Sequence, residues 1–122
     1  MKKTDAKLPD SKNNLLMFII PQVDISETED FYFIRVNLPG IKKDDFSIKM
    51  DAQTLIIEGE KKKPKYGEYE IFHRIEREFG VFRRAITFRE KIDTDDVYAE
   101  LKDGVLFVKI KKSHLNINIE IK

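Results

Sequence analysis

The chain has 122 residues and a mass of 14.4 kDa, with 37% charged and 41% hydrophobic residues, which is the size of a single domain. Because 23 basic residues stand against 22 acidic ones, there is no general attraction to nucleic acid or to acidic membranes. The chain has no cysteine, which excludes disulfides, thiolate catalysis and zinc sites built on sulfur.

The longest apolar run, Leu15 to Ile20, has six residues, whereas a helix that spans a membrane needs about 20. No cleavage site of the secretory kind follows the run, so the sequence predicts a cytoplasmic protein with no membrane partner. Residues 1–22 lack the periodicity of a packed element, and we interpret residues 1–20 as a flexible N-terminal arm. The apolar run itself is either a core strand or an exposed segment that another protein binds.

From Asp30 onward, apolar residues recur with a period of two, which is typical of half-buried strands. Six segments show the pattern: Tyr32, Ile34, Val36 and Leu38; Phe46, Ile48 and Met50; Leu55 and Ile57; Phe82, Ile86 and Phe88; Ala99 and Leu101; and Val105 to Ile110. Asp103-Gly104 is a two-residue turn signal that joins the last two segments as a hairpin. With no helical window, the pattern predicts an all-β, immunoglobulin-like two-sheet β-sandwich over residues 21–110.

A charged and aromatic segment, residues 61–74, is too long for an ordinary hairpin loop. It carries Tyr66, Tyr69, Ile71 and Phe72, which is more apolar surface than a disordered linker keeps. We expect this surface to be buried, with another subunit as one candidate partner.

Residues 111–122 form a C-terminal tail in which Ile117, Ile119 and Ile121 alternate with polar residues. Such a strand-like end either completes its own sheet or adds to the sheet edge of a neighbouring subunit. We favour the neighbour.

Catalytic and cofactor chemistry is not indicated. The five glycines are scattered and begin no phosphate-binding loop, and Ser113 beside His114 on a charged tail cannot be held as a nucleophile and its base. The two histidines lack the spacing of metal ligands. The sequence therefore predicts a protein that is not an enzyme and has neither cofactor nor metal.

Two groups of charges have competing interpretations. The lysines of residues 61–63 could begin a nucleic-acid site, but Glu58, Glu60, Glu68 and Glu70 flank them and favour a solvated loop. Arg84 shares its parity with apolar neighbours, so its charge needs a partner. That partner lies either in the same subunit or across a dimer interface.

Taken together, five motifs in one order resemble the small heat shock proteins. They are Leu38-Pro39-Gly40; Leu55 to Glu60; Glu76-Arg77 followed by Gly80, Phe82 and Arg84; the hairpin from Ala99 to Leu106; and the isoleucine tail. The resemblance covers about Pro21 to Ile121. The chain departs from the family at Arg89 and Lys111, where proline is common.

The resemblance implies an alpha-crystallin domain in an ATP-independent chaperone, a holdase that keeps partly unfolded proteins from aggregating. Its partners would be unfolding clients and other copies of itself, as a homodimer and a higher oligomer. It would bind no nucleic acid and no membrane. The alternative is a dedicated-partner co-chaperone-like module on the same sandwich.

Site residues also follow from the resemblance. The dimer interface would comprise Tyr66, Tyr69, Ile71, Phe72 and Arg84. The tail motif Ile117, Ile119 and Ile121, in one of two overlapping registers, would bind a groove on another dimer lined by Phe46, Ile48, Met50, Val97, Ala99 and Leu101. Clients would bind Leu15, Leu16, Phe18 and Ile19.

Overall fold

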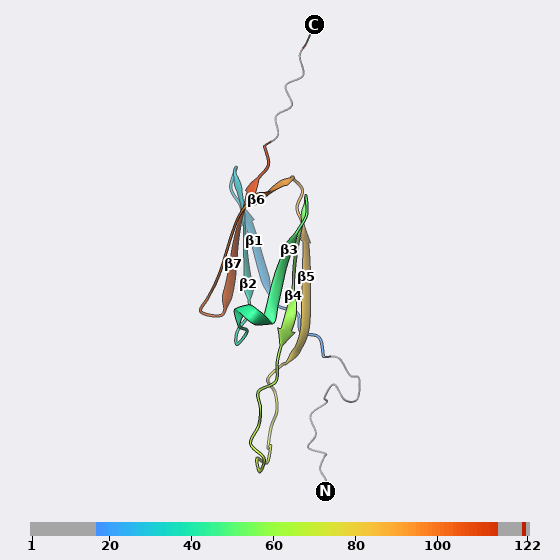
Figure 1. Cartoon of the computed structure of the whole chain (residues 1–122), viewed down its shortest axis with the longest axis vertical. Helices are drawn as coiled ribbons and strands as arrows, with labels where there is room; N and C mark the ends of the chain where they lie inside the picture. The colour runs from blue at the N-terminus through green and yellow to red at the C-terminus, as the bar shows by residue number, and fades with distance from the viewer. Residues whose placement is uncertain (1–16, 115–120, 122) are drawn as a thin grey trace.

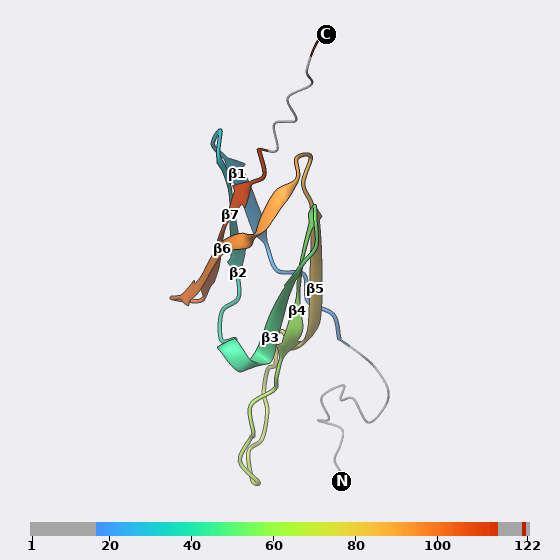
Figure 2. The ribbon, with the colours of Figure 1, turned by 45° about the horizontal axis from the view of Figure 1, so that its top comes forward.

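The computed structural model describes residues 17–114 and 121 of the chain. Within them seven strands form two facing sheets (Figures 1 and 2). The strands are β1 (Val23–Glu27), β2 (Phe31–Asn37), β3 (Phe46–Met50), β4 (Thr54–Lys61), β5 (Gly80–Thr87), β6 (Ile92–Lys102) and β7 (Val105–Lys112). A 3-10 turn, η2 (Lys43–Asp45), precedes β3. The predicted all-β sandwich is confirmed.

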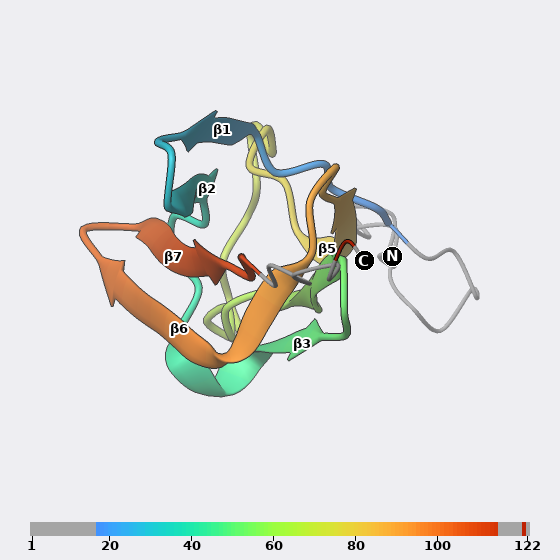
Figure 3. The same cartoon turned by 90° about the horizontal axis from the view of Figure 1, so that it is seen from above.

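The strand order places four strands at sheet edges. One sheet runs β1-β2-β7-β6 and the other β3-β4-β5, with antiparallel pairing throughout. Seen from above, the β3 and β6 edges face each other on one side, while the chain before β1 crosses from β5 on the other side (Figure 3). The sandwich therefore has two open sides, and each is bounded by one edge of either sheet.

The core consists of the inward-facing residues of both sheets. Ile34 pairs with Val108 and Val36 with Leu106 in the first sheet, and all four are fully buried. The largest fully buried side chains are Ile34, Leu38, Leu55, Ile57, Leu106, Ile110, Val36 and Val108. Removing this apolar surface from water is the main favourable contribution to folding.

The number of strands differs from the sequence-based expectation of six. The additional strand is β1, an edge strand with only Val23 half-buried, so it lacks the strong alternation of a core strand. The expectation also placed β6 near Ala99, but β6 begins at Ile92, with a bulge between Ile92 and Val97 that interrupts the period of two. The last strand continues beyond residue 110 to Lys112.

The segment between β4 and β5, residues 62–79, projects past the end of the sandwich, and its two halves run side by side (Figures 1 and 2). Its base is held by Phe79, which is buried beneath the cations of Lys61 and Arg77 at 5.9 and 5.1 Å from the ring centre. No helix in the part of the chain that the structure describes is long and apolar enough to cross a bilayer.

Candidate functional site

A hollow of about 290 Å³ lies between the β3 and β6 edges. It is lined by Lys43, Phe46, Ile48, Tyr98, Ala99, Glu100, Leu101 and Leu106. Four of the six predicted groove residues, Phe46, Ile48, Ala99 and Leu101, are thus brought together. The other two, Met50 and Val97, pack against the core.

The small side chain of Ala99 creates this hollow. Val97, Ala99 and Leu101 project toward the core side of β6, where Ala99 pairs with Val108 and Leu101 with Leu106. Because alanine fills little space between its two larger neighbours, the apolar layer beneath it stays accessible. Across the hollow, Phe46 and Ile48 on β3 supply the opposite wall.

This geometry suits an extended peptide. Each wall is an edge strand hydrogen-bonded to one neighbour only, so backbone donors and acceptors remain free to pair with an added strand. Side chains at positions i and i+2 of such a strand lie about 7 Å apart on one face. Two apolar residues with that spacing can therefore enter the groove together.

Polar groups border the hollow on both sides. On β6, the Tyr98 hydroxyl donates a hydrogen bond to Oε2 of Glu100 at 3.1 Å, and this carboxylate raises the pKa of Tyr98. Lys43 stands on the η2 side. The positive charge of Lys43 and the negative charge of Glu100 offset each other. The apolar residues that line the hollow therefore determine which ligand binds.

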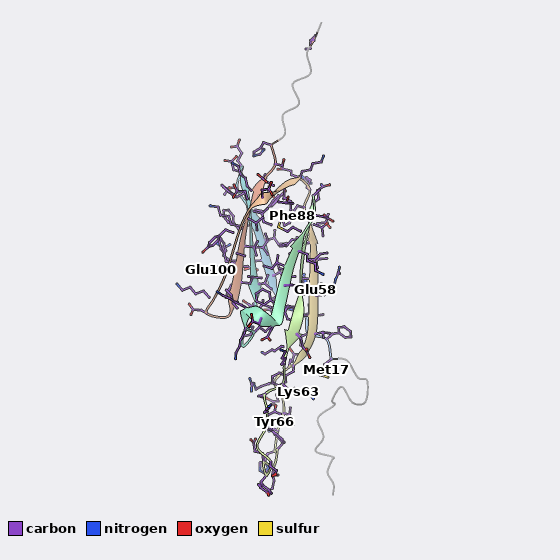
Figure 4. The ribbon with its side chains drawn as sticks, viewed as in Figure 1. Met17, Glu58, Lys63, Tyr66, Phe88 and Glu100 are labelled. Carbon is purple, nitrogen blue, oxygen red and sulfur yellow. The ribbon has the colours of Figure 1, made fainter. Side chains whose placement is uncertain are left out.

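The predicted dimer residues in the projecting loop divide into two pairs. The rings of Tyr66 and Phe72 meet edge to face at 4.5 Å and hold the two halves of the loop together. Figure 4 shows Tyr66 in this projecting loop. Tyr69, 90% exposed, and Ile71 have no such cover. Tyr69 lies within a turn, residues 67–70, in which the Gly67 N–H donates to the Glu70 carboxylate at 2.5 Å.

Arg84 lies on β5 opposite Ile57 of β4. Its Nη1 donates a hydrogen bond to the Pro21 carbonyl at 2.8 Å. No carboxylate within residues 17–114 comes within 4.0 Å of it, and its other N–H groups have no other acceptor there. Within a single subunit, the Arg84 guanidinium is therefore paired with a backbone carbonyl oxygen.

The residues predicted to bind clients and the tail motif lie at the ends of the described region. Phe18 is 71% exposed, whereas Ile19 packs against the core. Leu15 and Leu16 lie outside the described residues, as do Ile117 and Ile119. Ile121 is described and is exposed.

Sequence reasoning missed one buried charge. The side chain of Lys112 is only 4% exposed, and its Nζ lies 2.6 Å from Oε1 of Glu27 and 3.6 Å from Oε2 of Glu90. The same ammonium lies 4.8 Å from the centre of the Tyr32 ring. The sequence contains a signal for this position, because Lys112 continues the inward parity of Val108 and Ile110, although the prediction places it in the tail.

No three His, Asp or Glu side chains are grouped as metal ligands anywhere in residues 17–114 or at 121.

Comparison with known proteins defines the class. Residues 24–122 match the model of the Hsp20/alpha crystallin family, and the chain belongs to that family. The curated relatives that it matches include proteins named small heat shock protein and heat shock protein.

Relatives and solved structures agree with that assignment. Small heat shock protein C4 of Rickettsia felis is 36% identical over 104 residues, which cover 85% of this chain and 63% of the relative. Heat shock protein 16 of Schizosaccharomyces pombe is 34% identical over 93% of this chain and 83% of its own length. The chain spans 55% of a third relative, spore protein SP21 of Stigmatella aurantiaca.

The fold is shared with solved structures of similar proteins. Heat shock protein 16.0 from Schizosaccharomyces pombe superposes with a TM-score of 0.73 at 34% identity, covering 85% of this chain and 99% of that one. A small heat-shock protein from Xylella fastidiosa, whose structure is described as having a distinct high order structure, gives 0.70 at 34% identity, with 84% and 94% covered.

Proposed function

We propose that this protein is an ATP-independent holdase that binds partly unfolded proteins and prevents their aggregation. The observation that carries the proposal is the groove between β3 and β6, which combines an apolar floor with two free strand edges. Unfolding proteins expose extended apolar segments with free backbone groups, which are the complement of such a groove. Binding the non-native form lowers its free concentration by mass action and needs no nucleotide.

The functional unit in this proposal is a dimer formed by exchange of the projecting loops. The exposed pair Tyr69 and Ile71 would be buried on a partner subunit, and the free edge of β1 is a suitable place for an added strand. Ile25 on β1 is an exposed apolar residue that such a strand would cover. Arg84, with guanidinium N–H groups to spare, would pair with an acidic residue of the partner.

Assembly beyond the dimer would use the tail. The Ile117, Ile119 and Ile121 motif of one dimer would occupy the groove of another, covering the same apolar floor that binds clients. Release of the tail would then expose the groove. A chain without cysteine suits a reducing compartment, and we place the protein in the cytoplasm.

The test is light scattering from an aggregation-prone protein heated with increasing amounts of this chain, without nucleotide. We expect suppression at near-equal subunit ratios and none with an inert protein. The same assay is run on a chain shortened before Ile117, so that an occupied groove cannot conceal activity. Absence of suppression by both forms, with each shown to be folded, would reject the holdase and favour a dedicated-partner module.

A further inference from the structure

The second open side of the sandwich, between β5 and β1, is crossed by residues Met17–Gln22, which we term the strap. The Ile19 N–H donates to the Val81 carbonyl at 3.0 Å, and the Val81 N–H donates to the Met17 carbonyl at 2.9 Å. These two bonds form a parallel bridge between Phe18 and Val81. Figure 4 shows Met17 beside the end of β5. The strap thus pairs with the start of the β5 edge through a single bridge.

Two further contacts secure the far end of the strap. The Pro21 carbonyl accepts the hydrogen bond from Arg84, at 2.8 Å, and the Asn37 N–H donates to the Gln22 carbonyl at 3.0 Å. Arg84 belongs to one sheet and Asn37 to the other. The end near Gln22 is therefore fixed to both sheets, whereas the described residues near Met17 are held by the bridge and by the partly buried side chain of Ile19.

Gly80 makes the close approach at that bridge possible. Its φ of +143° is a conformation that other residues rarely adopt, and a Cβ at this position would collide with the Met17 carbonyl. Because the contact is between backbones, it does not depend on the side chains of the added strand. Any extended peptide can make it.

The side chains at the Met17 end of the strap contribute little to holding it in place, whereas Pro21 at the other end is buried. Ile19 is the inward anchor against the core, whereas Phe18 and Ile20 are 71% and 80% exposed. Beside the strap lies a cavity of about 300 Å³ that Leu38 and Ile41 line on the core side. Two hydrogen bonds and one partly buried side chain make this end replaceable by a peptide that fills the site better.

We propose that the β5 edge is a second client site, which takes an extended apolar segment of an unfolding protein in place of residues 17–20 of the strap. The strap shows the chemistry that fits: an extended backbone with one apolar side chain, that of Ile19, facing inward. Since β3 and β5 are opposite edges of one sheet, this site is separate from the groove. The inference rests on the proposed holdase function and adds a second, self-covered surface to it.

A disulfide that fixes the strap to β5 and can be reduced again tests this inference. The native chain has no cysteine, so Phe18→Cys with Val81→Cys places a single pair of thiols across the bridge. The matched control is Thr54→Cys with Thr87→Cys, which joins paired residues of β4 and β5 whose hydroxyls are 3.3 Å apart, without touching the strap. Formation of each disulfide is confirmed by mass before use.

We expect the oxidised strap-locked chain to need several-fold more subunits than its reduced form to suppress client aggregation. The control pair should be equally active in both states. Equal activity of the locked and reduced strap variants would overturn the proposal. Wild-type chain measured in parallel distinguishes this result from a failure of the holdase function itself.

A second readout does not depend on chaperone activity. A fluorescent peptide with the sequence of Met17–Gln22 is titrated with each form, and its anisotropy is followed. Binding to the reduced and not to the oxidised strap variant supports the site. Binding to both forms alike, or to neither, contradicts it.

Discussion

The ammonium of Lys112 lies 2.6 Å from the carboxylate of Glu27, which joins the last residue of β7 to the last residue of β1. Strand β2 lies between these two strands, and the ammonium passes over the ring of Tyr32 on that strand. The contact thus fastens an edge strand to the point where the C-terminal tail begins.

Replacing Lys112 with alanine should loosen this end of the sheet. The lysine stem is buried, so alanine removes packing as well as the ion pair, whereas methionine keeps most of the packing. We expect Lys112→Ala to lower the melting temperature by several degrees and Lys112→Met to lower it less. Hydrogen exchange should rise in β1. Unchanged protection of β1 in Lys112→Ala would show that the ion pair does not hold the strand.

The pH dependence of the same pair has a definite sign. The hydrogen bond to Glu27 raises the pKa of Lys112 in the folded state. Its stabilising contribution is therefore complete below the pKa of an unfolded lysine and is lost as the pH rises through the folded-state pKa. Urea unfolding from about pH 10 upward should show a steeper loss for wild type than for Lys112→Met. Parallel curves would contradict this assignment.

Glu58 on β4 should give a pH dependence of the opposite sign, because its pKa is lowered and it is an acid. Lys49, at 3.0 Å, and then Arg83, at 3.6 Å, lower the pKa of this carboxyl. A lowered pKa means that the contribution is present above the usual carboxyl pKa and disappears as the pH falls through the folded-state value. From about pH 5 to 3 wild type should lose more stability than Glu58→Gln, by urea unfolding. The half-exposed position makes the difference small.

Filling the groove should prevent assembly beyond the dimer without preventing folding. In Ala99→Phe the ring would occupy the hollow over Val108 and exclude the tail, and because Ala99 is exposed the sandwich should still fold. Light scattering after size exclusion should give the mass of a dimer, as should a chain with serine at Ile117, Ile119 and Ile121. Lys102→Gln, on β6 and outside the lining of the groove, is the control and should keep the wild-type mass. If the serine variant dissociates and Ala99→Phe does not, the tail docks elsewhere.

The dimer should depend on the exposed apolar pair of the loop. Burying a side chain such as Tyr69 or Ile71 contributes about 1.5–3 kcal/mol, and a homodimer loses two copies, so its change to serine should weaken the dimer about 100- to 10,000-fold. Sedimentation of diluted samples measures this shift. Glu68→Gln in the same loop is the matched control and should leave the dissociation constant unchanged. The loop does not form the interface if Tyr69→Ser and Ile71→Ser also leave it unchanged.

Much of the fold could be predicted because a period of two over consecutive residues identifies the core face of a strand. The rule holds for β2, where Tyr32, Ile34 and Val36 are buried, and for β7, where alternate residues are buried. The rule fails at β1, since an edge strand with one half-buried residue has no strong alternation. It also fails at the bulge in β6, where the period is interrupted.

The candidate site was predictable only in part. Its two apolar walls follow from strand parity and the family resemblance, but the hollow depends on the small size of Ala99 relative to its neighbours. The partner of Arg84 could not be predicted, because a backbone carbonyl has no signature in the sequence. The same holds for the strap, whose contacts at Val81 are between backbone groups.

Capture of a non-native protein is the central claim, and recovery of the complex tests it most directly. A client is heated with the chain without nucleotide, cooled, and passed over a size-exclusion column after the pellet is removed. The account predicts a soluble, high-mass peak that contains both proteins and contains far less client for Ala99→Phe. Client found only in the pellet or eluting by itself, with the chain eluting unchanged, would contradict it.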